Sequence, residues 1–230
     1  MQGFTLVEIS IVLVIVGLLV GGLLTPLGVQ LEQRRAADTR KAMEEARDAL
    51  AGFAVRNGYL PCPAISASNG LEDRSGDRCT GGRRIGFLPW ATLGVPKLDS
   101  WGHLYLYSVT PAFSDSAVIF RLNTPRDITV ASRDAPGALV QASESNDIPA
   151  VILSHGRNGY GAYSEQGTRI SDIGRRNVDE KANLNPAGTL FVSRDPADSE
   201  AAPGGPYDDI VVWLSPNILF NRMVAAQRLP

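Results

Sequence analysis

Hydrophobic residues fill the start of the chain and then give way to a regularly spaced pattern. Residues 9–24 contain no charged side chain, and one carboxylate, Glu8, precedes them. Between residues 30 and 57 the chain is rich in Ala, Glu, Arg and Gln, and its apolar residues recur mostly every three or four positions. Gly58 then supplies a residue typical of a helix C-terminus. The pattern predicts one long helix that begins at residue 4 and ends at residue 57.

The first part of this helix has the length expected of a membrane span. Residues 4–24 number about 21, and a helix needs roughly 20 residues to cross a bilayer core. A secretory signal peptide has a shorter apolar core, of about 7–15 residues, before a small-residue cleavage site. We therefore expect residues 4–29 to form a retained transmembrane helix. Pro26 lacks a backbone N–H and clashes with the preceding turn, which predicts a kink or a melted stretch at residues 24–28.

Beyond the long helix, hydrophobic positions form short runs that end at turn residues. Runs rich in β-branched and aromatic residues are typical of strands, whereas the segments 133–145 and 195–206 are rich in Pro, Gly, Ala, Ser and Asp and are expected to be loops. The strand-like runs are residues 104–109, 117–122, 128–131, 150–153, 189–193 and 210–214. Ser215 followed by Pro216 predicts a short C-terminal helix. The predicted fold is α+β, with the long N-terminal helix packed on an antiparallel sheet with elaborated loops.

Composition limits the classes of function. The chain has 230 residues, of which 44% are hydrophobic, enough for one span and one globular domain of about 170 residues. Its net charge of −2 provides no basic field for nucleic acid. Ser154 and His155 are adjacent, and adjacent residues of a strand point to opposite faces. The sequence contains no nucleophile elbow, phosphate loop or spaced set of metal ligands. We therefore do not expect an enzyme.

A short string precedes the apolar run. Residues 3–8, Gly-Phe-Thr-Leu-Val-Glu, resemble the processing site of the type IV pilin and pseudopilin superfamily. The resemblance implies that a prepilin peptidase cleaves between Gly3 and Phe4 and that the new amine of Phe4 is methylated. It also implies that Glu8 pairs with the amine of a neighbouring subunit during filament assembly. Electrostatics favours this pairing, because a desolvated cation and carboxylate attract each other strongly and burying either one alone costs free energy.

Three further strings are similar to those of major pseudopilins of type II secretion, and they occur in the same order. They span residues 99–107, 154–159 and 208–213. Major pseudopilins hold a calcium ion in a C-terminal loop, so the resemblance implies Asp208 and Asp209 as candidate calcium ligands. Calcium takes six to eight oxygens, and Asp195, Asp198 and nearby carbonyls are candidates for the others. The alternative is that Asp208 and Asp209 begin a strand without any ligand, and no other cofactor is expected.

The sequence contains two cysteines, Cys62 and Cys79. Beyond a span, in an oxidising compartment, they are expected to form a disulfide that closes the loop after the long helix. Zinc is a poor alternative because it takes four ligands and only His103 and His155 are available as histidines. In many type IV pilins the disulfide lies near the C-terminus, so this position argues against an ordinary major pilin.

The resemblance implies a structural subunit, either a minor pilin or a pseudopilin, of a type IV filament system. It divides the chain into a leader (1–3), a transmembrane and filament-core helix (4–29) and a periplasmic or extracellular pilin-like domain (30–230). The expected partners are other pilin subunits, the prepilin peptidase, an inner-membrane platform protein, an assembly ATPase and the membrane. The expected location is the bacterial inner membrane, as a single-pass protein with a periplasmic C-terminal domain, and then a periplasmic or surface filament. The alternative is a filament-tip adhesin or ligand-binding protein on the same anchor.

Overall fold

The computed structural model describes residue 3 and residues 5–171 and 177–229, and for residues 19–26 it describes the backbone only. The chain forms two compact units, Met1–Asp38 and Thr39–Pro230. Helix α1 (Leu6–Asn57) supplies the described part of the first unit and continues into the second. The elements that follow are β1 (Arg74–Ser75), β2 (Arg78–Cys79), β3 (Ile85–Phe87), α2 (Trp90–Leu93), β4 (Leu106–Val109), β5 (Thr129–Arg133), β6 (Leu139–Gln141), β7 (Ala150–Ser154), α3 (Val178–Asn183), β8 (Leu190–Val192), β9 (Ile210–Leu214) and α4 (Pro216–Ala225).

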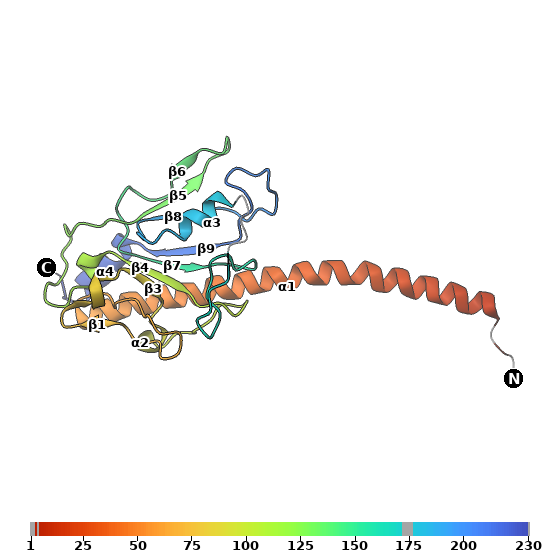
Figure 1. Ribbon diagram of the computed structural model, residues 1–230, viewed down its shortest axis with the longest axis horizontal. Helices are drawn as coiled ribbons and strands as arrows, with labels where there is room; N and C mark the ends of the chain where they lie inside the picture. Colours follow the sequence, from red (N-terminus) through yellow and green to blue (C-terminus); the bar gives the residue numbers. More distant parts are fainter. Residues whose placement is uncertain (1–2, 4, 172–176, 230) are drawn as a thin grey trace. The chain divides into compact units, whose positions relative to one another are not determined.

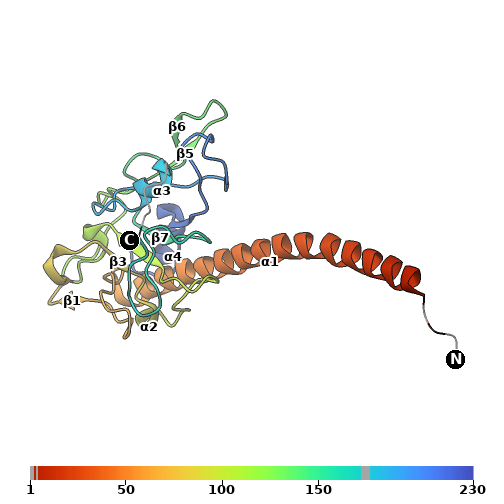
Figure 2. The same ribbon diagram turned by 45° about the vertical axis from the view of Figure 1, so that its right-hand side comes forward.

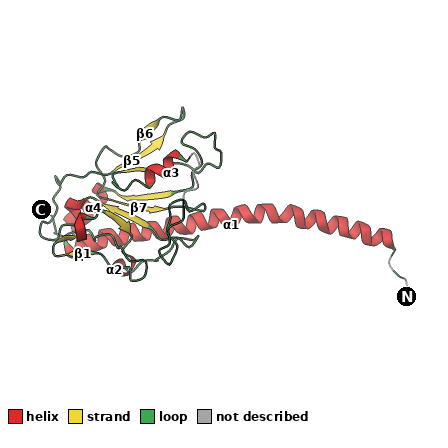
Figure 3. Ribbon diagram, viewed as in Figure 1, coloured by secondary structure: helices red, strands yellow, loops and turns green. Residues whose placement is uncertain are grey.

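The long helix predicted from the sequence is present and ends where predicted. We expected a kink or a melted stretch at residues 24–28; α1 is continuous there (Figure 3), so the melted stretch is absent. A proline removes only one hydrogen bond, and those on either side continue the helix. At the C-terminus Gly58 has a φ of 87°, and its N–H donates to the Ala54 carbonyl at 2.7 Å. This left-handed glycine caps the helix, as the sequence indicated.

The expectation of a membrane span over residues 4–29 is wrong. Within the part of the chain that the structure describes, no helix combines the length and the apolar character needed to cross a membrane. Crossing a bilayer core takes about 20 predominantly apolar residues. Glu8 places a carboxylate in the first turn of α1, and a charged side chain inside a bilayer core is costly. The expected location as a single-pass inner-membrane protein is corrected on the same finding.

Two sheets form the second unit. The larger has the strand order β3-β4-β7-β9 and is antiparallel throughout. The smaller has the order β6-β5-β8, and its β5–β8 pair is parallel, which departs from the antiparallel expectation. A parallel pair needs a crossover connection, and here the chain between β5 and β8 includes β6, β7 and α3.

The larger sheet packs on both faces. Figures 1 and 2 show it between the C-terminal half of α1 and the smaller sheet. Side chains alternate across a strand, and on β7 Val151 and Leu153 join an apolar cluster with Val130 of β5 and Phe191 of β8. The opposite layer is supplied by the apolar stripe of α1, whose members are buried, namely Met43, Ala46, Leu50, Phe53 and Ala54.

Strand prediction succeeded in the core and failed at the periphery. The runs at 104–109, 128–131, 150–153, 189–193 and 210–214 correspond to β4, β5, β7, β8 and β9. The run at 117–122 forms bends and turns instead, and its Val118 and Ile119 are exposed. β-branched residues favour strands because they fit a half-buried pleated surface, and no described strand pairs with this segment. The predicted C-terminal helix is confirmed as α4, with Pro216 as its first residue.

Candidate functional sites

The N-terminal string forms a helix cap. The backbone N–H and the hydroxyl of Thr5 donate to Glu8 Oε2 at 2.9 and 2.8 Å, and the Glu8 N–H donates to Thr5 Oγ1 at 3.3 Å. This reciprocal arrangement is a capping box, a signal that the Thr-x-x-Glu spacing carries in the sequence. The bond from the Thr5 backbone, and then that from its hydroxyl, lower the pKa of Glu8. Gly3 is exposed, and Phe4 lies outside the described residues.

The first turns of α1 present apolar side chains to solvent. The large apolar residues from Leu6 to Leu18 have exposed fractions between 48% and 86%. Residues 11–16 are consecutive exposed apolar residues, and because successive residues of a helix point about 100° apart, this run covers the whole circumference. The polar Ser10 is satisfied within the helix, because its hydroxyl donates to the Leu6 carbonyl at 2.8 Å. An apolar surface of this extent marks an interaction site.

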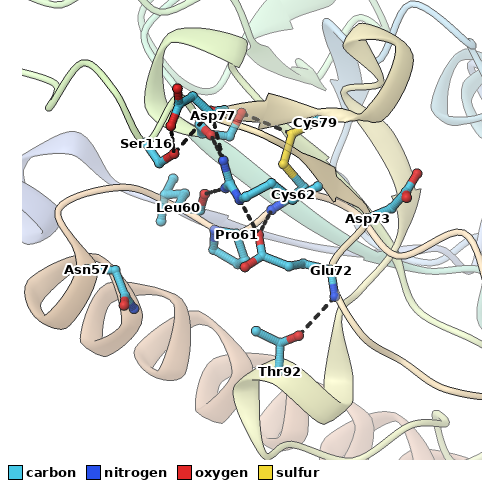
Figure 4. A network of polar contacts seen from close by, with 12 residues as sticks. Asn57, Leu60, Pro61, Cys62, Glu72, Asp73, Asp77, Cys79, Thr92 and Ser116 are labelled. Atoms are coloured by element: carbon cyan, nitrogen blue, oxygen red, sulfur yellow. Dashed lines mark hydrogen bonds and ion pairs between the residues drawn. A yellow bond between two sulfur atoms is a disulfide. The ribbon is translucent and has the colours of Figure 1, made fainter.

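Cys62 and Cys79 form the predicted disulfide, which closes the segment after α1 (Figure 4). A polar network holds the same segment. Glu72 Oε2 accepts the Cys62 N–H and the Arg74 Nε–H, each at 3.0 Å. The Arg74 guanidinium also donates to the backbone carbonyls of Leu60, Asp77 and Ser114. The loop is therefore held in place by charge-assisted hydrogen bonds as well as by the disulfide.

Loss of the disulfide is expected to lower the free energy of unfolding by about 3 kcal/mol, because closing a loop of this length removes that much chain entropy from the unfolded state. Thermal unfolding of the full chain with and without reductant, and of the paired variant Cys62→Ala/Cys79→Ala, measures the loss. Arg78→Ala is the control, because its ion pair with Asp115 is exposed on the arginine side and should contribute less than about 1 kcal/mol. An unchanged midpoint, with free thiols in the untreated protein, would contradict the disulfide.

Asp99 joins the 99–107 and 154–159 strings. Its Oδ1 accepts the N–H groups of Trp101 and His103 at 2.9 and 2.8 Å, and its Oδ2 accepts the Ser154 hydroxyl at 2.6 Å. Both Asp99 and Ser154 are buried. Ser154 therefore has a structural role, and its hydroxyl donates to Asp99 rather than to His155.

The 154–159 and 208–213 strings also lie together. Gly156 has a φ of 59°, and a Cβ there would lie 2.2 Å from the Asp208 carbonyl oxygen, so only glycine fits. The Asn158 N–H donates to Asp208 Oδ2 at 3.0 Å. The three strings, far apart in the sequence, thus form one connected region of the fold.

Asp208 and Asp209 meet a third carboxylate in this region. One oxygen from each of Glu180, Asp208 and Asp209 lies within 4.8 Å of the other two. These three residues are called the carboxylate cluster below. Glu180, on α3, is fixed by Asn158 Nδ2 at 2.8 Å, by the Asp208 N–H at 2.9 Å and by Asn177 Nδ2 at 2.6 Å.

Two oxygens of the carboxylate cluster remain unsatisfied. Asp208 Oδ1 and Asp209 Oδ1 are buried and accept no hydrogen bond from any described residue. His155 is 1% exposed, its Nδ1 lies 3.5 Å from Asp209 Oδ1 without hydrogen-bond geometry, and neither ring nitrogen has a described partner. Burial, followed by the charge of Glu180, raises the pKa of Asp208 to about 7. Burial, followed by the charge of Asp209, raises the pKa of Glu180.

Sequence reasoning found two members of the carboxylate cluster and missed the third. It suggested Asp195 and Asp198 as further ligands, but neither belongs to the cluster, and Asp198 accepts Arg157 Nη2 at 2.8 Å. The Asn-x-x-Glu spacing that ends at Glu180 is typical of a helix start and could have placed α3. No sequence rule brings that helix beside Asp208.

Comparison of the chain with protein-family models, with curated proteins and with solved structures found no significant match. The contacts and exposures of its own residues are therefore the basis on which a function is proposed.

Proposed function

We propose that this chain is a structural subunit of a type IV filament system, of the minor-pilin or pseudopilin class. The observation that carries the proposal is the exposed apolar surface between Leu6 and Leu18, which follows the Gly3–Phe4 junction directly. A helix that is apolar around its circumference is suited to burial among other helices. Packing these surfaces between neighbouring copies removes them from water, which is the main favourable term in association.

The N-terminal chemistry sets the register of assembly. Cleavage of the peptide bond between Gly3 and Phe4 by a prepilin peptidase leaves a free amine on Phe4, which is then methylated and remains cationic. In the capping box, Thr5 donates to Oε2 of Glu8 and leaves Oε1 outside that pair of bonds. Glu8 Oε1 then accepts the amine of the neighbouring subunit, so both charges are paired when the interface excludes water. Other pilin subunits, a platform protein and an assembly ATPase complete the proposed set of partners.

The mature N-terminus tests the proposal first. Mass spectrometry of the chain isolated from cells, and of fibres sheared from them, is expected to show a protein that begins at methylated Phe4. Its abundance in the fibres separates a main subunit from a minor one. A chain that retains Gly3, or that is cut beyond Leu24, would be incompatible with processing as a pilin.

Replacing Glu8 with Gln distinguishes its role in the helix cap from its proposed pairing with the amine of the neighbouring subunit. Glu8→Gln preserves the capping box, because Gln serves equally at that position, but it removes the negative charge. We expect Glu8→Gln to lower incorporation into fibres at least tenfold, measured against a tagged wild-type subunit. The matched variant Thr5→Ala removes the cap, at a cost of about 1 kcal/mol of helix stability, and keeps the charge, so it should still assemble. Wild-type incorporation of Glu8→Gln would refute the pairing.

We further propose that the carboxylate cluster holds a calcium ion. Two buried carboxylate oxygens without a partner, beside a third carboxylate, form a hard-oxygen donor set that suits calcium. Glu180, Asp208 and Asp209 would be the side-chain ligands, and nearby backbone carbonyls would supply the remaining oxygens. Because Glu180 lies on α3 and the aspartates precede β9, a bound ion would join these two elements.

A further inference from the structure

A cavity of about 550 Å³ lies on the face of the larger sheet that also bears the apolar cluster. Ile85 and Phe87 of β3 and Leu106 of β4 form its apolar floor, because these positions share one face of the paired strands. Tyr163 forms a wall, and its ring packs edge-on against Phe87 with the ring centroids 5.0 Å apart. A volume between about 300 and 1,000 Å³ is usual for small-molecule sites.

Two cations without partners line this cavity. Arg83 and Arg169 are both exposed, and neither side chain forms a hydrogen bond or ion pair with any described residue. No described Asp or Glu lines the cavity. The neighbouring Arg84, by contrast, is largely buried and forms an ion pair with Asp127. The cavity therefore combines an apolar floor with uncompensated positive charge.

A buried imidazole lies beside these cations. His155 also lines the cavity, is 1% exposed, and has no hydrogen-bond partner at Nε2 among the described residues. A buried polar atom without a partner is uncommon and needs a structural or functional explanation. An acceptor group placed in the cavity would provide one.

We propose that this cavity binds a small amphipathic carboxylic acid, a role additional to filament assembly and independent of it. The carboxylate pairs with Arg83 and Arg169, whose planar guanidinium groups match a carboxylate with two parallel hydrogen bonds. The apolar body of the acid covers Ile85, Phe87 and Leu106. Inorganic phosphate would pair with the two arginines but would leave the apolar side chains of the floor exposed to water. The apolar floor therefore favours an organic acid.

Calorimetric titration of the full chain with 3-phenylpropionate and with its neutral analogue 3-phenylpropanamide tests the assignment. We expect the acid to bind at least tenfold more tightly than the amide, because a charge-assisted hydrogen bond is roughly twice as strong as a neutral one. Arg83→Gln and Arg169→Gln should each weaken the acid about tenfold and leave the amide unchanged. Arg121→Gln is the control, because Arg121 is exposed and does not line the cavity.

A variant that fills the cavity tests whether the acid binds there and not elsewhere on the chain. Ala67 also lines the cavity, and Ala67→Phe is expected to abolish binding of both probes by filling it. Equal affinity for acid and amide, an acid that binds Arg83→Gln and Arg169→Gln as tightly as wild type, or binding that survives Ala67→Phe would each overturn the proposal. Tighter binding of an acidic octapeptide than of 3-phenylpropionate would overturn the small-acid assignment in favour of a peptide.

Discussion

Without added cation, the free energy of unfolding is expected to fall by up to about 4 kcal/mol as the pH rises from about 4 to 8. Burial and then the charge of Glu180 raise the pKa of Asp208 from 3.8 to about 7 in the folded chain. A difference of about 3 pKa units corresponds to about 4 kcal/mol. Between the two values the folded state binds more protons than the unfolded state. Stability is therefore complete at low pH and is lost as the pH rises through the folded pKa.

Calcium is expected to reverse this loss. An ion that binds only the folded chain stabilises it by about 2.7 kcal/mol at a concentration 100 times its dissociation constant. The experiment is a series of denaturant titrations between about pH 4 and pH 8, with chelator or with calcium. Asp208→Asn keeps the shape of the side chain and removes the charge.

This variant should lose the part of the pH dependence that comes from Asp208, should therefore lose less stability than wild type between about pH 4 and pH 8, and should gain little from calcium. Flat stability of the wild type in chelator would contradict the raised pKa of Asp208. Equal stabilisation of Asp208→Asn and wild type by calcium would place the ion elsewhere.

Replacement of the neighbouring Asp179 is expected to lower the free energy of unfolding by about 3–5 kcal/mol at neutral pH. Arg133 donates to Asp179 at 2.8 and 2.7 Å, and Arg194 Nε–H donates to it at 2.7 Å. The Asp179 side chain is 2% exposed and that of Arg194 is 9% exposed. Asp179→Asn leaves two largely buried guanidinium groups without their counter-charge. Such removal of one partner is costly because the other charge stays desolvated.

The pH dependence of Asp179 has the opposite sign to that of Asp208. Burial alone would raise the pKa of Asp179, but hydrogen bonds from Arg133 and Arg194 outweigh it and lower the pKa. The contribution of Asp179 to the free energy of unfolding is therefore present above the unfolded pKa, at about pH 4, and is lost as the pH falls further.

Replacement of the adjacent residue, Glu180→Gln, should instead stabilise the cation-free chain at about pH 8, because Glu180 has a raised pKa.

Urea unfolding of Asp179→Asn and Glu180→Gln measures this pair of effects. Asp198→Asn is the matched control, because the Arg157–Asp198 pair is 2.8 Å long but exposed and should contribute less than about 1 kcal/mol. A loss in Asp179→Asn no larger than that in Asp198→Asn would show that the two arginines find other partners.

Local signals in the sequence predicted local structure well. The stripe of α1, its glycine cap, the proline that begins α4 and the five central strands were all identified from spacing and residue type. The pairing of Cys62 with Cys79 was also predicted. The run at 117–122 was wrongly predicted as a strand, because β propensity describes how a residue fits a sheet and cannot supply the neighbouring strand. Hydrophobicity alone likewise suggested a membrane span that the described residues do not support.

The sequence by itself determined the Gly-Phe-Thr-Leu-Val-Glu string that resembles a pilin processing site, the apolar first turns of α1, and the choice of Asp208 and Asp209 as candidate ligands. Only the tertiary structure decided that Glu180 joins those aspartates, that Asp99 holds Ser154, and that Arg83 and Arg169 share a cavity floored by β3 and β4. Helix caps and turns depend on residues a few positions apart, so their signals can be read along the chain. The sites depend on residues brought together across long sequence separations. Their burial, and hence their pKa values and unmet hydrogen bonds, exists only once the core has packed.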